Sequence, residues 1–126
     1  MPLTAPTTAA PRRRNDAPPN TIPFSDTTEV WFWTMQAHKA LLEGARVRAG
    51  QALLPRPCEP GDILKVVERL YRQGRLRHEH VQVLARYGQQ MLAPERDRAR
   101  EAADWLLWQE ALGRMEPILR DKGIIL

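Results

Sequence analysis

Cysteine is nearly absent from this sequence: Cys58 is the only one among 126 residues. A single thiol cannot form an intramolecular disulfide, which excludes a disulfide-stapled secreted scaffold and favours a reducing, cytoplasmic environment. The chain also lacks any run of about 18 consecutive apolar residues, and no signal-like apolar segment lies near its start. We therefore expect a soluble, cytoplasmic protein without a membrane span.

Patterns typical of metal sites and of catalysis are missing as well. The three histidines, His38, His78 and His80, have no spacing among themselves or with Cys58 that is typical of a zinc site, so we expect no metal. No phosphate-binding glycine loop, nucleophile motif or obvious carboxylate pair stands out, so we expect neither an enzyme nor a bound cofactor. His78 and His80 fit exposed polar positions, and Cys58, between two prolines, fits a partly buried thiol.

Proline divides the chain into two parts. Six of the eleven prolines lie in residues 1–24, among mostly Ala, Thr and Asn. Such a segment buries too little apolar surface to offset the entropy lost on ordering, so residues 1–24 are predicted to be a disordered Pro-rich tail. Arg12, Arg13 and Arg14 make this tail locally basic. Residues 25–126 suffice for a single small domain.

What the sequence does contain is helical periodicity. Apolar residues recur every three or four positions, and no segment shows the alternation typical of a strand, so the predicted fold class is all-α, a compact bundle of about four helices. Tyr71 is expected in the apolar stripe of the second helix, and Pro117 is expected to kink the last helix without ending it. The predicted helices run from Ser25 or Asp26 to Gly50, from Pro60 to Gln73, from Arg77 to Met91, and from Glu95 to Asp121.

Positive charge gathers in the middle of the chain. The net charge is +4, and residues 62–94 hold six basic and three acidic residues. The connection between the second and third helices is short and contains Gly74, which suits the left-handed conformation that ends many helices. Leu76 is placed to pack back on that helix end. Residues 60–91 are therefore predicted to form a helix-turn-helix-like hairpin.

This hairpin offers side chains of the kinds that bind double-stranded DNA. Basic residues on the second helix and the turn suit phosphate contacts, which position a protein without reading sequence. On the third helix, Arg and Gln side chains that share one face suit bidentate pairing with base edges in the major groove. The first hypothesis is a small helical DNA-binding protein, in the role of a transcriptional regulator. Its candidate residues are Lys65, Arg69, Arg72, Arg75, Arg77, His78, Gln82, Arg86 and Gln89.

A second hypothesis belongs to a different class. Arg and Gln are common on any solvated helix, and Glu68 and Glu79 weaken the positive field of the hairpin. The protein would then be a helical protein-protein interaction module or small subunit without a nucleic-acid role. The stretch VWFWTM, residues 30–35, carries three aromatic side chains that cannot all face one core. Trp31 and Met35 are the candidate interface residues, for a protein partner or a homodimer.

Overall fold

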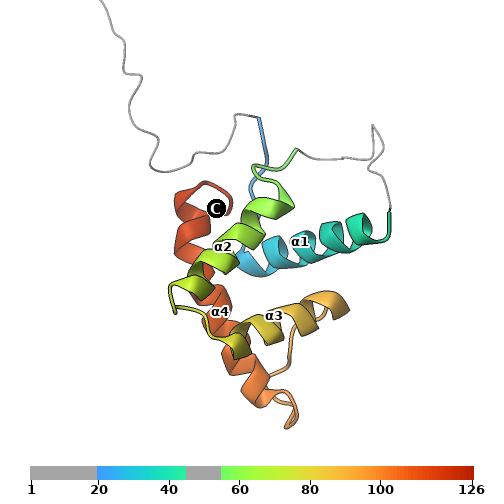
Figure 1. The fold of residues 1–126 in the computed structure, drawn as a ribbon, viewed down its shortest axis with the longest axis vertical. Helices are drawn as coiled ribbons and strands as arrows, with labels where there is room; N and C mark the ends of the chain where they lie inside the picture. The colour runs from blue at the N-terminus through green and yellow to red at the C-terminus, as the bar shows by residue number, and fades with distance from the viewer. Residues whose placement is uncertain (1–19, 45–54) are drawn as a thin grey trace, which may run out of the picture.

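The computed structural model describes residues 20–44 and 55–126, which form a bundle of α-helices (Figure 1). The predicted all-α fold class is confirmed. The only β-type pairing within the described ranges is a single parallel bridge between Phe24 and Ile125. None of the described helices is long and apolar enough to cross a membrane. The helices are α1 (Thr27–Leu42), α2 (Pro60–Arg72), α3 (His78–Gln90) and α4 (Ala102–Asp121).

The four helices share one hydrophobic core. In Figure 1, α4 runs along the long axis of the molecule, and each of the other three helices contacts it. The helix α1 also packs on both α2 and α3, and α2 and α3 contact each other, so every pair of helices is in contact. Fully buried side chains come from every helix and include Val30, Ile63, Leu84, Trp108 and Met115.

The folded domain begins before residue 25. Phe24 is fully buried, its N–H donates to the Ile124 carbonyl at 2.8 Å, and the Leu126 N–H donates to the Phe24 carbonyl at 3.0 Å. The guanidinium of Arg56 lies 4.1 Å from the centre of the Phe24 ring. The predicted tail boundary at residue 24 therefore misses a core residue, because composition carries no sign that two distant segments pair. The rest of the predicted tail, residues 1–19, lies outside the described residues.

The start of α1 agrees with the sequence. Asp26 caps the helix by accepting the Glu29 N–H at 2.9 Å, and the Glu29 carboxylate accepts the Ser25 N–H at 2.7 Å. The helix stops at Leu42, and Gly44 adopts the left-handed conformation with φ of +78°. The predicted end at Gly50 lies outside the described residues, and within them Gly44 suits the left-handed position that follows a helix end.

The last helix starts later than predicted. Residues 96–101 form turns and a bend, and α4 begins only at Ala102. From there the helix continues through Pro117, as predicted, and ends before Gly123, which adopts φ of +78°. This unbroken helix gives the bundle a scaffold along which both members of the α2–α3 hairpin pack.

Candidate nucleic-acid interface

The turn between α2 and α3 has a closed hydrogen-bonding pattern. Gly74 adopts φ of +75°, and its N–H donates to the Tyr71 carbonyl at 3.0 Å. The Arg75 N–H donates to the Leu70 carbonyl at 2.8 Å, which completes the Schellman motif that ends a helix. Leu76 is buried in the core, so the predicted roles of Gly74 and Leu76 are confirmed. The turn that carries Arg75 and Arg77 is therefore held by its backbone.

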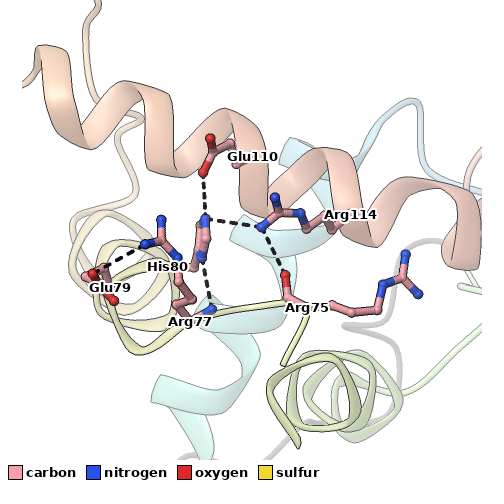
Figure 2. Close-up of polar contacts among 6 residues, drawn as sticks. All are labelled: Arg75, Arg77, Glu79, His80, Glu110 and Arg114. Carbon is pink, nitrogen blue, oxygen red and sulfur yellow. Dashed lines mark hydrogen bonds and ion pairs between the residues drawn. The ribbon is translucent and has the colours of Figure 1, made fainter. Parts of the chain in front are cut away.

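A buried histidine fixes the other end of this turn. His80 is fully buried, and its Nδ1 accepts the N–H of Arg77, the N-cap residue of α3, at 3.0 Å (Figure 2). Because Nδ1 accepts a hydrogen bond there, the ring proton is assigned to Nε2, which donates to the Glu110 carboxylate at 2.8 Å. The prediction that His80 is exposed is wrong. Its position three residues after an N-cap brings the ring back over the helix start and onto the buried side of α3.

The helix α4 supplies the partners that hold this turn. The guanidinium of Arg114 donates to the Arg75 carbonyl at 3.0 Å, and Glu110 lies one turn before Arg114 on α4 (Figure 2). The hydrogen bond from His80, aided by the nearby positive charge of Arg114, lowers the pKa of the Glu110 carboxyl. Both ring nitrogens of His80 are hydrogen-bonded, so the ring joins the start of α3 to α4.

All nine residues predicted for the hairpin have exposed side chains. The buried side of α3 instead consists of His80, Val83, Leu84, Tyr87 and Gly88. The helix α4 packs against this inner side, so it leaves the outer faces of α2 and α3 uncovered. Exposure to solvent is a requirement for DNA contact, and each candidate meets it, while their role stays a prediction.

The basic residues of the hairpin differ in how they are neutralised. Arg86 donates to the Asp104 carboxylate at 3.0 Å, and Arg77 lies 3.8 Å from Glu79. Such exposed ion pairs are worth at most about 1 kcal/mol, so a phosphate can replace the carboxylate at little cost. Four other cations have no ion pair with any residue of the described ranges. These are Lys65, Arg69, Arg72 and Arg75.

Tyr71 is an exposed aromatic residue among these cations. It was predicted in the apolar stripe of α2, but 48% of its surface is exposed, and Val66 takes the fourth buried position instead. Tyr71 directly precedes Arg72 in the last helical turn of α2, close in sequence to Arg75 and Arg77. An exposed tyrosine in such a place can stack on a base or pack on a sugar. Tyr71 falls at the edge of the buried stripe of α2, and that edge position is the sequence signal that could have indicated its exposure.

The two interface candidates have different environments. Trp31 is buried, and its indole N–H donates to the Leu84 carbonyl at 2.9 Å, so its expected exposure is wrong. Gly88 makes this possible, because a Cβ there would lie 2.8 Å from the indole nitrogen and 2.7 Å from Cγ of Met35. Met35 is half-buried and lines an open groove of about 580 Å³ between α1 and α3.

The remaining chemically interesting side chain is Cys58. The thiol is partly buried, as predicted, and burial raises its pKa to about 12, with a further contribution from the negative charges of Asp62 and Glu59. A thiol protonated at neutral pH is a poor nucleophile. In the part of the chain that the structure describes, no three His, Cys, Asp or Glu side chains gather closely enough to hold a metal ion.

The site thus combines a hairpin that exposes cations with a set of hydrogen bonds that joins its turn to α4. We call this set, made by His80, Glu110 and Arg114, the brace. The exposed side chains that the sequence singled out lie on α2, on α3 and between them. The brace residues His80, Glu110 and Arg114 come from two segments that the sequence analysis did not connect. No protein-family model matches this chain, and neither curated proteins nor solved structures match it.

Proposed function

We propose that the protein binds double-stranded DNA through the outer faces of α2 and α3, in the role of a small transcriptional regulator. The observation that carries this proposal is the set of exposed hairpin cations without ion-pair partners within the described residues. Like charges held close together repel one another, and a phosphate backbone relieves that repulsion while it releases condensed counterions. A second supporting observation is the fixed turn, because a preformed surface loses little conformational freedom on binding.

The two helices have different parts in this proposal. Lys65, Arg69 and Arg72 on α2, with Arg75 on the turn, contact phosphates and set the position of the protein on the duplex. Gln82 and Gln89 on α3, with His78 and Arg86 on the same face, contact base edges. Arg86 exchanges its carboxylate partner for a base edge or a phosphate on binding.

The test is the salt dependence of duplex binding, measured by fluorescence anisotropy. Each phosphate contact contributes about 0.9 to the slope of log K against log salt concentration. A variant with Arg69, Arg72 and Arg75 changed to Gln should therefore have a slope shallower by about 3. The matched control changes three exposed arginines that lie between α3 and α4, and it should keep the wild-type slope. The control residues are Arg96, Arg98 and Arg100.

Two outcomes would contradict the proposal. One is the absence of wild-type binding at low salt, where electrostatic attraction is strongest. The other is an equal change of slope in both triple variants, which would mean that only the net charge of the protein matters. Loss of slope confined to the hairpin variant supports the proposal.

A second candidate function is protein–protein interaction at the groove between α1 and α3. The observation that favours it is apolar exposure, since Leu42 is 75% and Met91 is 43% exposed, and both line the groove beside Met35. Sedimentation velocity across a concentration series tests association with a second copy. A wild-type dimer that is lost on changing Leu42 and Met91 to Glu would support this function, and a monomer at every concentration would count against it.

A further inference from the structure

A second hollow lies where α2 meets the C-terminal end of α4. A groove of about 310 Å³ opens there, and Lys65 and Arg69 line it from α2. Lys122, the residue directly after α4, lines it from the other side. The groove therefore brings a third cation, far along the chain, next to two residues that the sequence had already assigned to phosphate contact. Its apolar lining includes Pro57, Val66, Ile118 and Ile124.

The charges around this groove are poorly balanced. Lys65, Arg69 and Lys122 are all exposed, and none of them has an ion pair with a residue that the structure describes. Asp62 is the only acidic residue in the lining, and its carboxylate already accepts the Glu59 N–H at 2.8 Å. Cys58, which also lines the groove, is a neutral thiol at physiological pH. Three cations thus face one hollow together with one carboxylate, which suits an anion.

The groove also continues the row of cations on α2. An α-helix rises 1.5 Å per residue, so Lys65 and Arg72 are separated by about 10 Å along α2. That distance corresponds to about three nucleotides of one strand at 3.4 Å of rise each. Lys122 lies at the Lys65 end of this row, because it shares the groove with Lys65 and Arg69. One strand that follows α2 would therefore pass over the groove.

We infer that this groove seats a backbone phosphate of the bound duplex, with Lys122 as an additional phosphate-binding residue. The inference rests on the proposed function and extends its contact surface from the hairpin onto α4. A phosphate there bridges the α2 and α4 cations and lies over an apolar floor that the sugar can contact. The contact is to the backbone, so it adds affinity without base preference.

The test compares Lys122→Gln with Lys39→Gln in the anisotropy assay. Lys39 is also exposed but lies on α1, away from this groove. Loss of one phosphate contact should make the slope of log K against log salt shallower by about one for Lys122→Gln, for every duplex sequence. Lys39→Gln should keep the wild-type slope. The Lys122 side chain has no hydrogen bond or ion pair with any described residue, so circular dichroism should show an unchanged fold.

The outcomes separate this inference from the proposed function. If the hairpin triple variant loses slope but Lys122→Gln does not, the groove inference is wrong and the hairpin interface stands. If the wild type does not bind duplex at all, both are wrong. A titration with inorganic phosphate, followed by the NMR shift of the Lys122 amide, distinguishes the source of the phosphate. A shift with duplex alone supports a backbone seat, whereas saturation by micromolar phosphate would overturn it in favour of a free-phosphate site.

Discussion

Replacing His80 with Ala should destabilise the protein by about 3 to 4 kcal/mol. The ring is fully buried, and removing a buried side chain of this size leaves a cavity that costs about 2 to 3 kcal/mol. The same change removes the acceptor of the Arg77 N–H at the start of α3, and loss of a capping bond costs about 1 kcal/mol. Glu110 is half-exposed, so water can replace its bond to His80, and that bond is not counted.

Urea unfolding followed by tryptophan fluorescence measures this loss directly. His80→Gln is the matched variant, because Gln at the third helical position can accept the N-cap N–H just as His80 does. The Gln variant should therefore recover about 1 kcal/mol of the free energy of unfolding lost in His80→Ala. A loss below about 1.5 kcal/mol for His80→Ala would refute the brace, since it is less than the cavity alone predicts. Equal stabilities of the Ala and Gln variants would refute the capping role.

Three further predictions concern packing and titration. A Cβ at Gly88 would lie 2.7 Å from a side chain of α1, so Gly88→Ala should lose about 1 to 2 kcal/mol of unfolding free energy, whereas Gly113→Ala, in open space, should gain about 0.5 to 1 kcal/mol. Equal urea midpoints for the two variants would contradict this packing. The folded pKa of Glu110 is lowered by His80, so its contribution to stability is complete above the ordinary pKa near 4.3 and is lost as the pH falls through the folded pKa. The stability difference between wild type and Glu110→Gln should therefore vanish in acid, and a difference that persists at pH 2 would be inconsistent with this origin. With its pKa near 12, Cys58 has a thiolate fraction of roughly 1 in 10,000 at pH 8, so iodoacetamide should modify it far more slowly than free cysteine unless urea is added.

Helical periodicity was enough to predict most of the fold. The apolar spacing predicted four helices and placed the hairpin candidates on outer faces, because a period of 3.6 residues fixes which side chains share a face. Gly74 and Leu76 marked the turn correctly, since the left-handed helix end is a local property of the chain. These features depend on neighbours within a few residues, which the sequence shows directly.

The features that periodicity missed depend on contacts between distant segments. His80 follows two exposed residues, His78 and Glu79, and its side-chain partner Glu110 lies 30 residues away on α4. Phe24 joins the core only because the C-terminal residues pair with it. Of three adjacent aromatic residues in α1, Trp31 is the one buried, and that follows from the glycine at position 88 opposite it. None of these pairings leaves a local pattern in the sequence.

The most direct test of the nucleic-acid interface is an amide NMR titration of the protein with a short duplex. We expect the largest shift changes on Lys65 to Arg86 and on Lys122, and no change in the groove between α1 and α3 around Met35 and Leu42. Shift changes centred on that groove, or none at low salt, would contradict an interface on the α2–α3 hairpin.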